Sequence, residues 1–156
     1  MNEKDPVSAA ATQSAAAPSR AGAPVDLRPD HAGISVADLE ASIAWYCDML
    51  GFTVDRVVDI PEDIGRLALI RHGDFLLELF AIPGAAPLPD ERRHPATDLR
   101  TQGVKHVAYA VADIRALMEH LKAQGVDVVW DVVLHDGTWC AFVRDNSGNL
   151  VEFVER

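Results

Sequence analysis

Basic residues, paired cysteines and long apolar runs are all scarce in this chain of 156 residues. Lys and Arg number 14 against 24 Asp and Glu, and a net charge of −10 repels a nucleic-acid backbone. Cys47 and Cys140 have no CxxC spacing, which argues against a disulfide framework and against a zinc knuckle. No apolar run approaches the roughly 18 residues of a membrane span, and the start lacks the pattern of a secretion signal. We therefore expect a cytoplasmic protein without nucleic-acid or membrane partners.

The first 25 residues differ in composition from the rest. They contain eight Ala, three Pro and three Ser but no aromatic residue, so they cannot build a core. We predict a disordered tail over residues 1–25 and one domain over residues 26–156, a length that supports a hydrophobic core.

An internal repeat organises residues 26–156. The repeated residues are His31 and His106, Asp38 and Asp113, Gly51 and Gly125, and Glu78 and Glu152, each pair 74 or 75 positions apart. Such self-similarity indicates a duplicated unit. We place module 1 at about residues 29–81, a proline-rich linker at 82–102 and module 2 at about 103–156.

Each module carries the pattern of one helix and four strands. Apolar residues at helical spacing predict helices between Asp38 and Gly51 and between Asp113 and Gly125, with the aspartates as N-caps. Each helix follows a short strand that begins at a histidine. The other predicted strands cover residues 52–60, 66–72, 75–81, 126–133, 138–144 and 150–154. The fold class is therefore α+β, with two βαβββ modules.

Strand alternation points to a metal site. His31 and His106 share a strand face with small residues, and Glu78 and Glu152 point away from the apolar side that faces the helix. Two neutral imidazoles and two carboxylates carry a charge of −2, which one divalent ion would neutralise. We expect one such ion per site and leave its identity open among Zn, Co, Ni, Mn and Fe. The simpler alternative is that duplication copied a structural His and Glu, in which case no metal binds.

These residues resemble the vicinal oxygen chelate superfamily, which includes glyoxalase I, methylmalonyl-CoA epimerase, cyclitol epimerases, extradiol dioxygenases and bleomycin resistance proteins. The similarity covers residues 30–155 and is strongest from Asp30 through Trp45-Tyr46 to Phe52, and in the closing segment from Phe142 to Glu152. It implies the same four metal ligands. It also implies that the modules curl into an open mixed sheet around the ion, either within one chain or across a homodimer, and both arrangements stay open.

A divalent ion that binds two neighbouring substrate oxygens favours proton transfer beside a carbonyl, through an enediolate. We expect a metal-dependent epimerase or isomerase that acts on an acyl-CoA, a ketose or a valiolone-type cyclitol. The resemblance to glyoxalase I implies that Glu152 or Glu78, as a metal-bound glutamate, is also the catalytic base. A lactoylglutathione lyase of the glyoxalase I type is an alternative, although no segment matches its glutathione contacts convincingly. Two further alternatives fit the four predicted ligands less well. An Fe(II) extradiol dioxygenase holds its ion with three protein ligands and needs no fourth. A non-catalytic small-molecule-binding protein of the bleomycin-resistance kind resembles this scaffold but lacks a full ligand set.

Further polar residues are candidates for contact with a small-molecule substrate. The candidates on or near the linker, suited to an anionic arm, are Arg92, Arg93, His94 and Arg100. His135 and Trp139, beside the Asp136-Gly137 turn, are candidates at the rim of the cleft. The alternative for the linker residues is a solvated charged loop.

Overall fold

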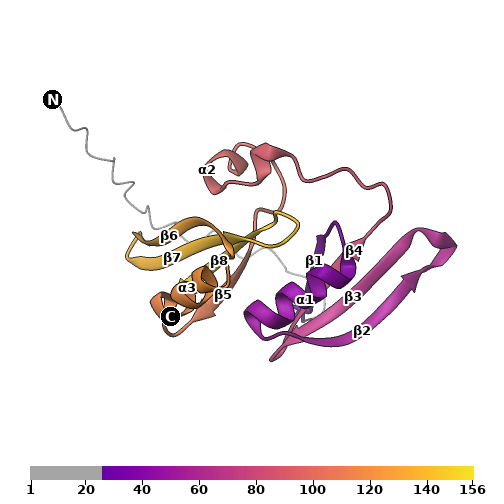
Figure 1. Cartoon of the computed structure of the whole chain (residues 1–156), viewed down its shortest axis with the longest axis horizontal. Coiled ribbons are helices and arrows are strands. Elements are labelled where there is room, and N and C mark those ends of the chain that lie inside the picture. The colour runs from indigo at the N-terminus through magenta and orange to yellow at the C-terminus, as the bar shows by residue number, and fades with distance from the viewer. Residues whose placement is uncertain (1–25) are drawn as a thin grey trace.

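A computed structural model describes residues 26–156, and the predicted tail over residues 1–25 lies outside the described residues. The elements of module 1 are β1 (His31–Ser35), α1 (Leu39–Leu50), β2 (Thr53–Ile60), β3 (Gly65–His72) and β4 (Phe75–Ala81). Those of module 2 are β5 (Val107–Val111), α3 (Ile114–Ala123), β6 (Asp127–His135), β7 (Thr138–Arg144) and β8 (Leu150–Glu155). The two modules lie side by side, each with its helix packed on its own sheet (Figure 1).

The two sheets repeat one topology. Their strand orders are β1-β4-β3-β2 and β5-β8-β7-β6, and in each the first strand runs parallel to the last strand of its module. The other strand pairs are antiparallel, and neither sheet closes on itself. This confirms the predicted α+β fold of two open βαβββ modules.

The helices begin and end where the sequence predicts. The Asp38 Oδ1 accepts a hydrogen bond from the Ala41 backbone N–H at 2.8 Å, and the Asp113 Oδ1 accepts one from Ala116 at 2.9 Å. Both satisfy backbone donors that a helix start leaves free. Gly51 follows α1 with φ of 70°, a left-handed conformation that glycine adopts without a steric penalty.

Two stretches differ from the prediction. The linker contains a 3-10 turn (η2, Asp90–Arg92) and one turn of helix (α2, Pro95–Asp98), which are too short to leave a periodic signal. The sixth strand runs to residue 135 rather than 133, because its pairing with β7 continues to the Asp136-Gly137 turn. Its register shifts twice, at Val128/Trp130 and at Trp130/Val133.

Each module has its own core, and aromatic residues join the two cores. Leu77 and Leu79 are fully buried under α1, which confirms that this side of β4 faces the helix. The Tyr109 ring on β5 packs edge-on against Phe52 and Phe75 of module 1, with centroids 5.8 Å apart in both pairs. The ring therefore packs into the core of module 1 and ties the modules together.

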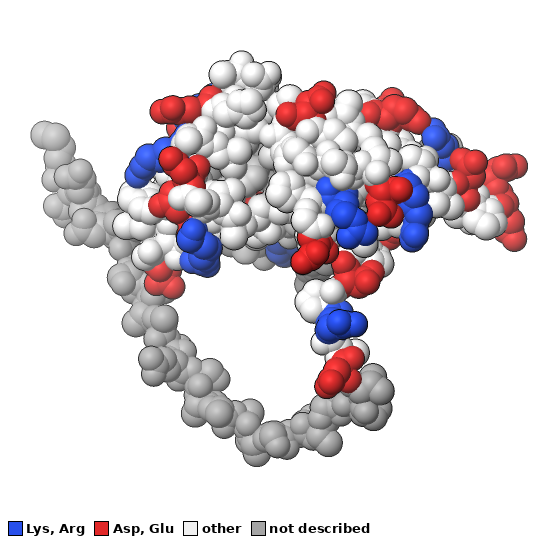
Figure 2. Space-filling view, turned by 90° about the horizontal axis from the view of Figure 1, so that it is seen from below, with Lys and Arg blue, Asp and Glu red and all other residues white. Residues whose placement is uncertain are grey.

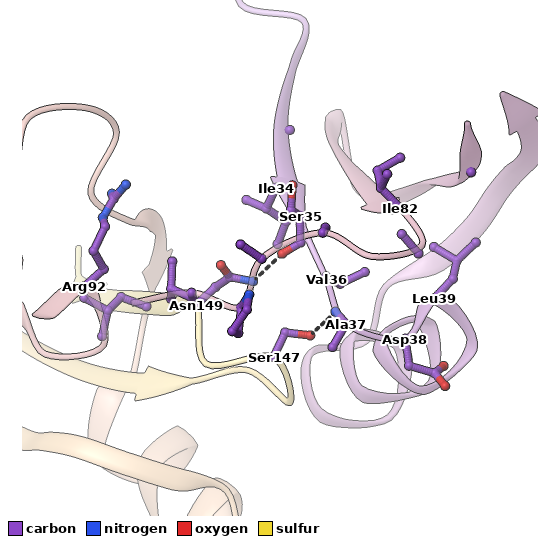
Figure 3. A pocket seen from close by; sticks show the side chains of 18 of the residues that line it. Ile34, Ser35, Val36, Ala37, Asp38, Leu39, Ile82, Arg92, Ser147 and Asn149 are labelled. Carbon is purple, nitrogen blue, oxygen red and sulfur yellow. Dashed lines mark hydrogen bonds between the residues drawn. The ribbon is translucent and has the colours of Figure 1, made fainter. Parts of the chain in front are cut away.

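A five-residue loop between β7 and β8 binds the start of α1. The Ala37 backbone N–H donates to the Ser147 hydroxyl at 3.0 Å, and the Asn149 side-chain amide donates to the Ser35 carbonyl at 3.0 Å (Figure 3). These bonds span more than 100 residues of chain, so they fix the orientation of module 2 on module 1.

The buried side chain of Asp145 holds this loop in place through hydrogen bonds. It is only 4% exposed, and its carboxylate accepts hydrogen bonds from the Ser147 and Asn149 backbone N–H groups. The Tyr46 hydroxyl also donates to Asp145, at 3.1 Å. Burial, together with the adjacent Asp145 charge, raises the pKa of Tyr46 well above its ordinary value, so the hydroxyl keeps its proton and remains a donor.

We expect Tyr46→Phe to lower the free energy of unfolding by about 1 kcal/mol, because it removes a donor from a buried carboxylate. Tyr109→Phe is the matched control. The Tyr109 hydroxyl is buried without a hydrogen-bond partner among the described residues, so its removal leaves stability unchanged or slightly higher. Urea denaturation of both variants tests this, and equal losses of stability in the two would contradict the assigned pairing.

Acidic side chains, which outnumber basic ones in the sequence, are prominent on the surface (Figure 2). On the face shown in Figure 2, basic side chains lie beside acidic ones, and acidic side chains gather at the end where Figure 1 shows the β2–β3 hairpin. Cys47 and Cys140 are both free thiols. None of the helices in the described part of the chain is long and apolar enough to cross a membrane.

Candidate metal centre

The first His/Glu pair lies on the open face of the module 1 sheet. The Nε2 of His31 is 3.3 Å from the Oε2 of Glu78. In the parallel register of β1 and β4, Glu78 lies opposite Gly33 rather than opposite His31, so the two side chains meet diagonally. A Cβ at Gly33 would lie 3.1 Å from the Phe80 ring and 3.7 Å from the Glu78 carboxylate. The glycine therefore leaves room for the pair.

The second pair repeats this geometry in module 2. The Nε2 of His106 is 3.0 Å from the Oε2 of Glu152. Glu152 lies opposite Ala108, two residues after the histidine, so a small residue again occupies the space between the two side chains. The His106 ring packs edge-on against Phe142, with centroids 5.1 Å apart, which limits its rotation.

The donor atoms of each pair suit adjacent positions on one metal ion. Ligand bonds of about 2.0–2.2 Å at a right angle place two donor atoms about 3 Å apart, close to the observed 3.0 and 3.3 Å. The His side chains are 42% and 32% exposed and the Glu side chains 18% and 19%, so all four remain accessible. Each pair therefore fits two adjacent positions of a divalent ion, in both donor chemistry and spacing.

Asp30 is a functional candidate that the sequence analysis did not select. Its Oδ2 accepts a hydrogen bond from the His31 Nδ1 at 2.7 Å, which orients the ring with Nε2 toward Glu78. This bond, aided by the negative charge of Glu78, raises the pKa of His31 above its ordinary value. A carboxylate on the far nitrogen is the usual support of a metal-binding histidine. The sequence feature that could have indicated this role is the position of Asp30 directly before His31, one of the two repeated histidines.

The structure brings the four predicted ligands together as two pairs. Within residues 26–156 of one chain, no three His, Cys, Asp or Glu side chains are placed to hold an ion jointly. His31 therefore meets Glu78, and His106 meets Glu152, but the two pairs do not meet each other in a single chain.

A groove of about 880 Å³ runs between the modules beneath the linker, and Figure 3 shows it from close by. It is lined by the β1–α1 connection, by the proline-rich part of the linker and by residues around His106. Of the four predicted ligands, His106 lines the groove, whereas His31, Glu78 and Glu152 do not. The groove therefore meets the second His/Glu pair at its histidine.

The candidate substrate residues of the linker have separate positions. Arg92 and Arg93 line the groove. The Arg92 guanidinium donates to buried Asp98 at 2.8 Å and also to the Val104 carbonyl. The His94 Nδ1 accepts from the Ala96 backbone N–H and caps α2, while Arg100 is exposed away from the groove. Among residues 26–156, the Arg93 side chain lines the groove and makes no hydrogen bond or ion pair, unlike that of Arg92.

The hairpin candidates also lie outside this groove. His135 ends β6 and is exposed. Trp139 packs against the module 2 core, and the Arg115 guanidinium lies 4.5 Å above its ring. A packing role accounts for the contacts of Trp139.

Comparison with known proteins gives consistent results. Residues 28–153 match the family model described as Glyoxalase/Bleomycin resistance protein/Dioxygenase superfamily. Lactoylglutathione lyase of Neisseria meningitidis is 32% identical over 132 residues, which cover 81% of this chain and 88% of that protein. The Escherichia coli protein YaeR is 35% identical over 97 residues, or 62% of this chain and 70% of that one. The glyoxalase family protein of Enterococcus faecalis superposes with a TM-score of 0.71 at 25% identity, covering 82% of this chain and 97% of that structure. The chain belongs to the Glyoxalase/Bleomycin resistance protein/Dioxygenase superfamily.

Proposed function

We propose that this protein is a divalent-metal-dependent isomerase that moves a proton at the carbon beside a carbonyl. The observation that carries the proposal is the repeated His/Glu geometry, with donor atoms 3.3 Å apart in one module and 3.0 Å apart in the other. One pair supplies two ligands, and a stable site for a divalent ion that also binds substrate needs three or four protein ligands. A complete site therefore needs both pairs.

We place the two pairs of one site on different copies of the chain, in a homodimer. Each pair lies on an open sheet face, and the pairs do not meet within a chain. The outer strand β2 supports this arrangement. Val57 and Val58 point to opposite faces of β2, yet both are exposed, as are Val133 and Leu134 on the equivalent strand β6. One residue of each two lies on the open face of its sheet, where a second copy that packs against that face would cover it.

The residues of such a site have definite roles. His31, Glu78, His106 and Glu152 would hold the ion, which when bound supplies a Lewis acid for negative charge that develops on the substrate oxygens. Glu152 or Glu78 removes the proton, since a carboxylate within reach of the reacting carbon acts as general base. Return of a proton to the opposite face of the same carbon gives epimerisation, and return of the proton to the adjacent carbon gives the glyoxalase isomerisation.

Lactoylglutathione lyase activity is the second candidate, and the names of the relatives favour it. It uses the same proton transfer but returns the proton to the adjacent carbon. Epimerisation of an acyl-CoA, ketose or cyclitol remains the first interpretation from the residues. A substrate panel that contains the glutathione hemithioacetal of methylglyoxal, a 2-methylacyl-CoA and a ketose distinguishes the two.

In heavy water, the purified protein is expected to exchange deuterium into the carbon beside the carbonyl of one substrate of this panel. Chelation should stop the exchange, and one of Zn, Co, Ni, Mn or Fe should restore it, because proton removal depends on the bound ion as a Lewis acid. Proton NMR follows the loss of the signal. Exchange that survives complete chelation would contradict the proposal, and oxygen consumption with catechols in place of exchange would favour the dioxygenase alternative.

A further inference from the structure

Arg93 occupies an unusual position in the groove beneath the linker. Its side chain is half-buried and lies over Gly148, where a Cβ would be 2.9 Å from the Arg93 Nε and 3.1 Å from the Nη2. Gly148 has φ of 90°, which also favours glycine at this position. The guanidinium therefore packs directly against the β7–β8 loop at Gly148, where a side chain would displace it.

The backbone around Arg93 is fixed as well. The Arg144 side chain of β7 donates from Nε to the Arg93 carbonyl at 2.6 Å and pairs with Asp127 at 2.7 Å. The next residue, His94, caps α2. The Arg93 backbone is thus held between β7 and α2 while its guanidinium lies against Gly148, which reduces the side-chain freedom that ligand binding would remove.

The other basic groups at this end of the groove are already paired. Arg92 and Lys105 both contact Asp98, which is only 1% exposed, and both also donate to backbone carbonyls. The Arg93 guanidinium, by contrast, has no hydrogen bond or ion pair among the residues that the structure describes. Its N–H donors are therefore available to a ligand in the groove.

The charge balance of this end favours an anion. Three basic groups, Arg92, Arg93 and Lys105, line this end of the groove. The buried carboxylates beside them are Asp98, which contacts Arg92 and Lys105, and Asp145 in the β7–β8 loop, so the basic groups exceed the carboxylates by one. Two further carboxylates line the groove itself, and both have partners. Asp38 caps α1, and Glu40 pairs with Arg66.

We propose that Arg93 forms an anion subsite that binds a carboxylate or phosphate group on an arm of the substrate. A guanidinium matches either group with two parallel hydrogen bonds. His106 lines the same groove, so the arm bound at Arg93 leads toward the candidate metal centre. This inference rests on the proposed function, because it states that the substrate of that reaction is an organic anion. Anion binding at Arg93 can nevertheless be measured without turnover.

The test uses the full chain with inorganic phosphate and, separately, succinate as probes, in the presence of a chelator so that metal-bound anion does not contribute. Titrations are followed by NMR of arginine Nε–H groups, and the Arg93 signal is identified by its loss in Arg93→Gln. We expect that signal to shift with at least one probe, and Arg93→Gln to weaken binding about tenfold or more. Preference for phosphate would indicate a phosphorylated substrate arm, and preference for succinate a carboxylate.

Arg100→Gln is the matched control, because it removes the same charge from an exposed position outside the groove. It should leave the affinity within about twofold of wild type. Arg93→Lys keeps the charge but loses the planar fork, so it should bind with intermediate affinity, and it replaces Arg93→Gln if that variant misfolds. Any of three results would overturn the proposal. The first is equal anion affinity in wild type and Arg93→Gln, the second is a loss of affinity in Arg100→Gln equal to that in Arg93→Gln, and the third is no saturable binding of either probe. A failed exchange assay with intact anion binding would overturn the proposed function alone.

Discussion

Glu152→Gln is expected to slow deuterium exchange into the substrate by about 10²–10⁴-fold, the usual contribution of a positioned general base. The amide keeps the size of the side chain but takes up no proton. It also removes one negative charge from the proposed ligand set, so metal content after dialysis should fall with the rate. Exchange kinetics by NMR and metal analysis of the same preparation measure both effects.

The fold should tolerate this change, because Glu152 is partly exposed and its nearest polar contact is His106. Glu119→Gln is the control, since Glu119 is exposed on α3 and alters the net charge by the same amount. We expect its exchange rate and metal content to equal those of the wild type. A Glu152→Gln protein with unchanged exchange rate and metal content would show that this carboxylate is neither base nor ligand.

The parts of the fold that could be predicted from the sequence are those with local causes. Asp38 and Asp113 cap the helices because a short acid at that point satisfies the first backbone donors. The meeting of each His with its Glu follows from strand alternation combined with the repeat. Each pair forms within its own module: His31 begins β1 and meets Glu78 on the neighbouring β4, and His106 directly precedes β5 and meets Glu152 on the neighbouring β8.

What could not be predicted depends on contacts between distant segments. The alternation of side chains along a strand tells which face of the sheet a residue lies on, but it does not tell how two sheets are oriented. The separation of the two His/Glu pairs in one chain could therefore not be predicted from the sequence. Arg92 and Arg93 are identical and adjacent in sequence, yet Asp98 and Gly148 give them different surroundings. The loop that positions Gly148 joins the modules through Asp145, whose partner Tyr46 lies 99 residues earlier.

Two variants that are inactive alone are expected to restore a working site when they assemble together. One variant carries His31→Ala and Glu78→Gln in module 1, and the other carries His106→Ala and Glu152→Gln in module 2. If each site takes one pair from each copy, a heterodimer of the two variants combines an intact module 1 pair with an intact module 2 pair in one of its two sites. If each site formed within a chain, every site in the heterodimer would lack one pair.

The decisive measurement is the metal content of that heterodimer, isolated after co-expression of the two variants with different affinity tags. We expect about half of the wild-type metal per dimer, because one of the two symmetric sites is intact, and we expect exchange activity to recover in the same proportion. Each variant purified alone should contain almost no metal and serves as the baseline. A heterodimer with no more metal than this baseline would contradict the shared His/Glu site.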